Sequence, residues 1–461
     1  MTASTASREA SNFSIPFAAF PSPVIRQLPN GLTIIAEQMP IDAVNLSIWL
    51  NMGSGVEPDS LNGMAHFLEH MIFKGTAEIA CGEFERLIEE RGAITNAATS
   101  QDYTNYYITT APKDFAALAP LQVELVVNPL FDDEHFERER PVILEEIRRA
   151  EDSPQRRTFY RSMEMYFDKL PYRRPVLGPT SVIEGLSAEQ MRSFHRTWYR
   201  PQNMTAVVVG NLPVEELVRV VEESFGQAWA RSATGVSSEV SSGASSREDR
   251  VADSDHTSHS SPSTHPESPF SALRRREYVD ESLQQARLVM GWRVPGMCEL
   301  DRTYPLDVLA SILSGGRTAR LIDDLRERRH LVNSISASNL SFSNQGVFYL
   351  SAKVAIDQLE VAEAAILAHI QRLHEVPVTD AELARVQTKV ANRYVFGSET
   401  PSDRAGLYGY YQAMTGNIRH ALDYPEHIRQ VSAADVQAAV QQYLPLNAYG
   451  AVILKPSHQA S

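Results

Sequence analysis

Residues 63–73 read Gly-Met-Ala-His-Phe-Leu-Glu-His-Met-Ile-Phe, a pattern that predicts an amphipathic helix with two histidines four positions apart. Side chains at this spacing share a helix face, so His66 and His70 can offer imidazole nitrogens to one metal ion. Glu69, directly before His70, could take a proton from a bound water. Taken alone, the pattern is equally compatible with exposed histidines. The candidate helix caps are Asp59, Ser60 and Asn62.

A second predicted helix, residues 136–147, carries glutamates that bear on the same site. Glu139 and Glu146 are seven residues apart, about two helical turns, and therefore lie on one face. Glu145 points about 100° away from Glu146. A catalytic zinc site usually has three protein ligands and a water, so a third ligand is needed from elsewhere in the chain.

With these motifs the chain resembles the pitrilysin and insulinase superfamily of zinc peptidases, in particular its short branch related to the mitochondrial processing peptidase. The H-x-x-E-H pattern is the inverse of the commoner H-E-x-x-H and is called the inverzincin signature. The resemblance implies one Zn²⁺ per chain, held by His66, His70 and Glu146, which lies 76 residues after the second histidine. It further implies that Glu69 is the general base and that Glu139 supports the site.

Residues 93–110 predict an edge strand of small side chains followed by a Thr- and Tyr-rich hairpin partner. Most of these residues read as plain sheet structure. The resemblance implies that the edge binds an extended peptide as an added strand, and such main-chain pairing tolerates many peptide sequences. The residues that we expect to bind substrate are Asn96, Ala97, Ala98 and Thr99 and, in the second half of the chain, Arg326.

Composition restricts the class of protein. A chain of 461 residues is too long for one core, and 43% hydrophobic with 22% charged residues is typical of globular proteins. A net charge of −14 argues against nucleic acid as a partner. Cys81 and Cys298 form no disulfide framework, which favours a reducing, cytoplasmic location. The apolar runs are shorter than the ~20 residues that cross a bilayer, and the first twenty residues lack a secretory pattern, so no membrane partner is expected.

The order of predicted elements occurs twice, on either side of a Ser-rich segment. Residues 231–270 have few large apolar side chains and predict a disordered linker between residues 20–230 and 271–461. A predicted helix at 214–229 ends just before it. The second-half counterpart of the histidine helix, near 305–314, contains neither His nor Glu. We therefore expect an α+β fold of two homologous, α/β-sandwich-like halves joined by a flexible linker, with one metal site. The resemblance implies that the halves close around a chamber.

One position departs from the family pattern. Many relatives carry, in the second half, an arginine and a tyrosine seven residues later that hold the backbone of the substrate. Arg326, in a predicted helix at 318–329, matches the arginine, but Asn333 stands at the tyrosine position. Asparagine can donate a hydrogen bond but is shorter and has no aromatic face. Because short relatives commonly work as dimers, we expect a homodimer or a heterodimer with a related chain.

Together these features predict a zinc-dependent metalloendopeptidase that hydrolyses extended peptides or small unfolded polypeptides in an enclosed chamber. The alternative is a non-proteolytic scaffold, or a partner subunit of a heterodimeric peptidase of the same fold. Relatives of that kind usually lose the metal motif, whereas all four of its residues are present here. The zinc content of the purified protein distinguishes the two.

Overall fold

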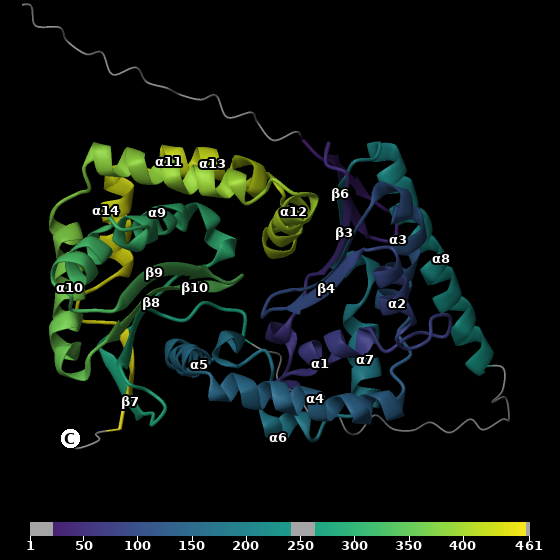
Figure 1. The fold of residues 1–461 in the computed structure, drawn as a ribbon, viewed down its shortest axis with the longest axis horizontal. Coiled ribbons are helices and arrows are strands. Elements are labelled where there is room, and N and C mark those ends of the chain that lie inside the picture. Colours follow the sequence, from purple (N-terminus) through teal and green to yellow (C-terminus); the bar gives the residue numbers. More distant parts are fainter. Residues whose placement is uncertain (1–21, 241–262, 458–461) are drawn as a thin grey trace, which may run out of the picture.

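The computed structural model describes residues 22–240 and 263–457 and contains two mixed β-sheets, each with its own layer of helices (Figure 1). No helix in these two ranges is long and apolar enough to cross a membrane. The first sheet runs, from edge to edge, β1 (Val24–Gln27), β2 (Thr33–Gln38), β6 (Met204–Gly210), β3 (Val44–Leu50), β5 (Thr104–Thr110) and β4 (Ile94–Thr99). The second sheet runs β7 (Arg274–Val279), β11 (Gly450–Lys455), β8 (Ala286–Pro295), β10 (Gln345–Val354) and β9 (Ser334–Ser341).

The two sheets share one strand plan. β2 and β6 pair in parallel, and so do β7 and β11. The next three strands of each sheet pair antiparallel, in the order β6-β3-β5-β4 and β11-β8-β10-β9. Among the described strands only β1 has no counterpart. The predicted α+β fold with two similar halves is therefore confirmed.

Helices cover the sheets in both halves (Figure 1). Those of the first half are α1 (Met64–Ile72), α2 (Glu83–Glu90), α3 (Pro112–Val127), α4 (Asp133–Asp152), α5 (Pro154–Tyr166), α6 (Thr180–Ile183), α7 (Ala188–Trp198) and α8 (Val214–Val240). Those of the second half are α9 (Tyr304–Ser314), α10 (Leu359–Glu375), α11 (Asp380–Phe396), α12 (Pro401–Thr415), α13 (Arg419–Gln430) and α14 (Ala433–Tyr443).

The central strands are buried on both faces because each sheet is covered on both faces. Every residue of β3 and β6 is buried. Ile34 and Val208 face the helices of the first half, whereas Ile35, Trp49 and Val207 join the core of the second half. A continuous apolar run such as β6 predicts burial on both faces. It does not predict which helix supplies the second cover.

The second face of each sheet is covered by a helix from the other half of the chain. α12, from the second half, packs on β3 and β6 of the first sheet, and α5, from the first half, packs on β8 and β11 of the second (Figure 1). A Cβ atom added to Gly409 of α12 would lie 2.0 Å from Trp49 Nε1. One added to Gly291 or Gly450 would lie 2.3 Å or 2.8 Å from the ring of Tyr166, at the end of α5. Glycine at these positions therefore permits the close approach of each exchanged helix to the opposite sheet.

The predicted linker at 231–270 is wrong at both ends. α8 continues to Val240 instead of ending at 229, and the Arg231 guanidinium lies 2.7 Å from the Glu124 carboxylate, which fastens this extension to α3. After the gap, Phe270 is buried and Glu267 accepts hydrogen bonds from three backbone N–H groups of the first half. Composition does not reveal that an acidic side chain finds such partners. Residues 241–262, like the first twenty residues, lie outside the described ranges.

The second-half counterpart of α1 is α9, which likewise follows a central strand and packs against an edge strand. Its half-buried Asp307 accepts hydrogen bonds from Asn339 Nδ2 at 2.9 Å and Tyr424 Oη at 3.1 Å. The helix predicted at 318–329 is shorter than expected and is a π-helix over Ile322–Arg328. Gly316 before it has φ +125°, a left-handed conformation that interrupts a helix.

Candidate metal centre

A buried carboxylate caps the helix that carries the histidines. Glu57 accepts hydrogen bonds from the N–H of Gly63 at 2.9 Å, the N–H of Ala65 at 2.6 Å and the Asn62 amide at 3.0 Å. An anion at a helix N-terminus is stabilised by unpaired N–H groups and by the helix dipole. Burial raises the pKa of Glu57 to about 7 in spite of these bonds.

The sequence did not reveal this cap. Of the expected caps, Asp59 is ion-paired with Arg174 at 2.9 Å, and Asn62 donates to Glu57 instead of binding the helix end. A 3₁₀ turn at Asp59–Leu61 reverses the direction of the chain. Glu57 therefore lies beside the first turn of α1, although it is six residues before Gly63 in the sequence. An acidic residue just before a helix was the only available signal.

The structure brings together one donor atom each from His66, His70 and Glu146, all within 4.8 Å of one another. The Nε2 atoms of His66 and His70 lie 3.5 Å and 3.7 Å from Glu146 Oε2. These separations are too long for hydrogen bonds, whereas two ligands about 2.0–2.1 Å from a tetrahedral zinc ion lie roughly 3.4 Å apart. Two imidazoles and a carboxylate are also a donor set that zinc prefers. The residues therefore fit a zinc ion.

The neighbouring Glu145 is directed elsewhere. Its carboxylate is ion-paired with Arg148 at 2.8 Å and with Arg149 at 2.9 Å on the outer side of α4. Hydrogen bonds from these two arginines lower the pKa of Glu145 to about 2. Of the two adjacent glutamates, only Glu146 lies beside the histidines.

Both imidazoles are in a state suited to ligation. Burial lowers the pKa of His66 to about 3, with a further contribution from His70, so this ring is neutral. His70 Nδ1 lies 2.9 Å from Glu139 Oε1, and because a carboxylate only accepts, Nδ1 carries the proton and Nε2 keeps a free lone pair. Lys74 binds the other oxygen of Glu139 at 2.7 Å. Burial would raise the pKa of Glu139, but hydrogen bonds from His70 and Lys74 hold it below its ordinary value.

Glu69 lies next to this group and is held by β4. The Thr99 hydroxyl donates a hydrogen bond to Glu69 Oε2. Burial raises the pKa of Glu69, and the charge of Glu146 adds to the effect, while Thr99 opposes it. A carboxylate with a raised pKa is suited to accept a proton and release it again near neutral pH. Thr99, expected to bind substrate, thus contacts the candidate base.

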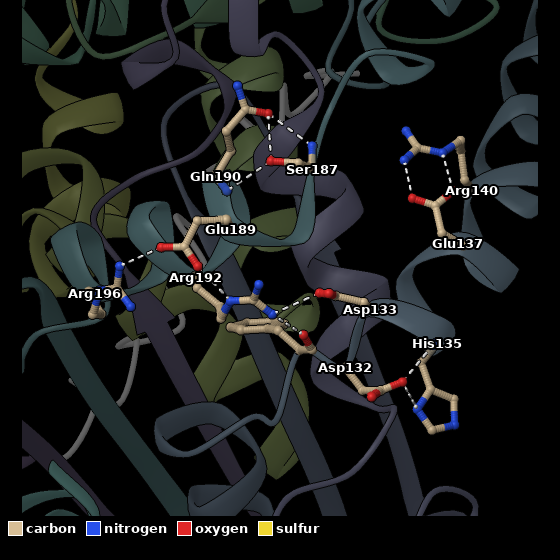
Figure 2. A network of polar contacts seen from close by, with 11 residues as sticks. Asp132, Asp133, His135, Glu137, Arg140, Ser187, Glu189, Gln190, Arg192 and Arg196 are labelled. Carbon is tan, nitrogen blue, oxygen red and sulfur yellow. Dashed lines mark hydrogen bonds and ion pairs between the residues drawn. The ribbon is translucent and has the colours of Figure 1, made fainter. Parts of the chain in front are cut away.

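α4 supplies both Glu139 and Glu146, and its first turns are fastened to the rest of the half (Figure 2). Arg192 of α7 binds Asp133 at 3.0 Å, and Arg140 donates to the Leu186 carbonyl at 2.9 Å. Contact between α4 and α1 includes the stacked rings of Phe136 and Phe67, with centroids 4.4 Å apart. The two helices that carry the site therefore have fixed relative positions.

β4 is an edge strand, with β5 on one side and no strand of the described ranges on the other. Asn96 and Ala98 lie opposite Tyr107 and Asn105 of β5. The N–H of Ala97 is bonded to the Asn96 side-chain oxygen at 2.9 Å. A peptide added to this edge would have to displace that side chain to use the Ala97 donor.

Arg326 is not brought to the metal centre by any contact within the described ranges. Its guanidinium is ion-paired with Glu327 at 2.6 Å, on the π-helix. Asn333, at the tyrosine position of the family pattern, is exposed just before β9, and its N–H bonds the Lys353 carbonyl at 2.9 Å. The sequence did not predict other residues near the site. No motif indicates Lys74, or the buried pair of Tyr106 and Tyr199, whose hydroxyl oxygens lie 2.7 Å apart.

Comparison with protein families identifies two matching profiles. One, described as insulinase (peptidase family M16), matches residues 32–180, and the other, described as peptidase M16 inactive domain, matches residues 185–390. An uncharacterized zinc protease of Rickettsia bellii (strain RML369-C) is 26% identical over 430 residues, covering 93% of this chain and 97% of the relative. One from Streptomyces coelicolor (strain ATCC BAA-471 / A3(2) / M145) is 27% identical over 425 residues, covering 90% and 86%.

Solved structures share the fold. A protease from Helicobacter pylori superposes with a TM-score of 0.82 at 23% identity, over 95% of this chain and 100% of that one. The first half of the periplasmic protease PqqL from Escherichia coli gives a TM-score of 0.70 at 19% identity, over 95% and 93%. The shared fold therefore extends over both halves of the chain.

Proposed function

Because the chain belongs to the insulinase family of peptidases, family M16, we propose that it is a zinc-dependent metalloendopeptidase. The observation that supports this activity most directly is the group of three ligand atoms within 4.8 Å of one another, with the Glu69 carboxylate beside them. The names of the relatives, which are called zinc proteases, agree with this metal.

In this proposal His66, His70 and Glu146 hold one Zn²⁺, which when bound supplies Lewis acidity toward the scissile carbonyl and the attacking water. Glu69 accepts the proton of that water and then delivers it to the nitrogen of the leaving amine. The Thr99 hydroxyl orients the Glu69 carboxylate for both transfers. Burial, which raises the pKa of Glu69, makes its carboxylate a stronger base and so favours the first transfer.

The proposed substrate is an extended peptide or a small unfolded polypeptide. The free edge of β4 supports this, since main-chain pairing there would place a peptide bond beside Glu69, which Thr99 at the end of the same strand contacts. The exchanged helices α5 and α12 keep the halves facing each other across this strand (Figure 1). We propose that the space between the halves is the chamber in which hydrolysis occurs.

The test is a Glu69→Gln variant. It should retain zinc, measured by elemental analysis, and lose about 10²–10⁴-fold in kcat/KM on a mixed peptide library, because only the proton acceptor is removed. Glu89→Gln, at an exposed position of α2, is the matched control and should keep full activity. Turnover of the Glu69→Gln variant close to that of the unmodified protein would contradict the mechanism. An absence of zinc from the metal-replete protein would favour a non-proteolytic subunit.

A further inference from the structure

A cavity of about 600 Å³ lies between α5 and the second sheet, within the range of about 300–1,000 Å³ that is typical of ligand sites. One wall belongs to the first half of the chain and the other to the second half. Aromatic and aliphatic side chains form much of the lining, and hydroxyl groups are interspersed. The residues that carry the following argument are Gln101, Ser153, Arg156, Tyr160 and Arg287.

The only charged residues in the lining are two arginines, Arg156 and Arg287, although the chain as a whole has a net charge of −14. Neither side chain forms an ion pair or a hydrogen bond within the described ranges. The cross-strand neighbour of Arg287 on β10 is Lys353, another cation. The carboxylate whose charge acts on Arg287, that of Asp280, is bound by Arg157 at 3.0 Å and by the Ser282 hydroxyl at 2.6 Å.

Two further observations favour an anion in this cavity. Burial lowers the pKa of Arg287 and the charge of Arg157 adds to this effect, although the charge of Asp280 opposes it. The N-terminus of α5, with its cap Ser153, also lines the cavity and contributes the positive end of a helix dipole. Like charges on neighbouring strands are destabilising, so an anion between them would be bound favourably.

The cavity adjoins the metal centre. Tyr160, in the lining, belongs to α5, which directly follows α4 with its Glu146 along the chain and packs against that helix. On the side of β4, the lining residue Gln101 follows Thr99, whose hydroxyl bonds Glu69, by two positions. A peptide on the edge of β4 that continued past Thr99 would therefore enter the cavity.

We propose that this cavity binds a carboxylate of the peptide substrate, with Arg287 as the residue that selects it. The inference rests on the proposed peptidase function and adds a substrate class, peptides with an acidic residue beside the scissile bond. A guanidinium binds a carboxylate through two parallel hydrogen bonds, which a neutral amide of the same shape cannot reproduce. The carboxylate can come from an Asp or Glu side chain or from the C-terminus of a short peptide.

The experiment compares peptides that differ only in Glu or Gln at each position flanking the cleaved bond, each as a C-terminal acid and as an amide. We expect kcat/KM to be about 10- to 100-fold higher for a carboxylate at one such position. Arg287→Gln should bring this ratio close to one, and Arg287→Glu should bring it below one, in favour of the Gln peptide. Arg276→Gln, on the exposed strand β7, is the matched control and should leave the ratio unchanged.

The same set of peptides shows whether the bound carboxylate is a side chain or a C-terminus. It also distinguishes failure of the carboxylate site from failure of the peptidase proposal. A ratio that follows the free C-terminus assigns the cavity to the chain end, and one that follows Glu assigns it to a side chain. Equal ratios in an active protein overturn the carboxylate site and leave the peptidase proposal standing. If no peptide is cleaved, the peptidase proposal fails, and calorimetric Kd values of the Glu and Gln peptides for the Glu69→Gln variant decide the site. Equal Kd values overturn it.

Discussion

At the scale of single residues, the metal centre depends on which of two adjacent glutamates faces the histidines. Glu146 Oε2 lies 3.5 Å from His66 Nε2, whereas Glu145 is ion-paired with Arg148 on the outer side of α4. The angular offset of about 100° between consecutive helical residues produces this difference. The structure therefore provides a matched pair of variants at neighbouring positions.

Glu146→Gln should weaken zinc binding by more than roughly 100-fold, since even loss of a residue that only supports a metal ligand costs about 10–100-fold. Glu145→Gln should leave the zinc affinity unchanged, because its carboxylate contacts arginines instead of the histidines. Competition with a chromophoric chelator measures both affinities. Equal affinities in the two variants would show that Glu146 is not a ligand.

At the scale of elements, α1 depends on a carboxyl group with a raised pKa. Because the pKa of Glu57 is about 7 in the folded protein and 4.5 ordinarily, the folded protein binds this proton more tightly than the unfolded chain. The resulting stabilisation, roughly 3 kcal/mol, is present below about pH 4.5 and is lost as the pH rises to about 7. α1 is therefore held less firmly above neutral pH.

Glu57→Gln should remove this pH dependence, because a glutamine does not titrate. The quantity to compare is the free energy of unfolding of the unmodified protein minus that of the variant, both measured with a chelator present. This difference should be greater at pH 5 than at pH 8, by up to roughly 3 kcal/mol. Urea unfolding at the two pH values measures the difference. The same difference at both values would mean that Glu57 has its ordinary pKa in the folded protein.

The exchanged helix α12 provides a second prediction at this scale. Gly409→Ala would place a methyl group 2.0 Å from Trp49 Nε1, and overpacking of this kind costs about 1–3 kcal/mol or more. The melting temperature should fall and the tryptophan fluorescence should change. Gly406→Ala, on the same helix with no atom within 4 Å of the added Cβ, should be neutral or slightly stabilising. Equal melting temperatures for the two variants would contradict the close contact.

At the scale of the whole molecule, buried ion pairs join the two halves where their sheets exchange helices. Arg404 of α12 lies 3.0 Å from the buried Glu37 of β2. Arg293 of β8 lies 2.8 Å from Glu267 and donates to the Tyr166 carbonyl at 2.6 Å. The first pair connects segments that are distant in the sequence, and Arg293 and Glu267 both bind the backbone of the first half, so the relative position of the halves depends on these contacts.

Glu267→Ala should destabilise the protein by roughly 1–3 kcal/mol, because the buried Arg293 loses one of its two carboxylate partners and keeps Asp168 at 2.9 Å. The N–H groups of Asp168, Lys169 and Leu170 also lose their acceptor. Glu281→Ala, at an exposed position nearby, is the control and should change the stability little. Thermal unfolding followed by circular dichroism compares the two, and a Glu267→Ala variant as stable as the control would show that this segment does not join the halves.

By itself the sequence determined the elements and the residue types of the candidate site. Short-range periodicity places His66 and His70 on one helix face, and Glu139 and Glu146 on another, because side-chain direction in a helix follows from the 3.6-residue turn. The repeated order of elements likewise predicted two similar halves, which the shared strand plan of the sheets confirms.

Only the tertiary structure decided which elements meet. The cap of α1 by Glu57, the exchange of α5 and α12, and the packing of Glu267 against the first half each depend on contacts between segments that sequence periodicity does not relate. The same holds for the cavity of Arg287, whose two walls come from different halves of the chain. Apolar runs predict that a strand is buried on both faces, but any helix with an apolar face can cover it, so the partner is fixed only by packing in three dimensions.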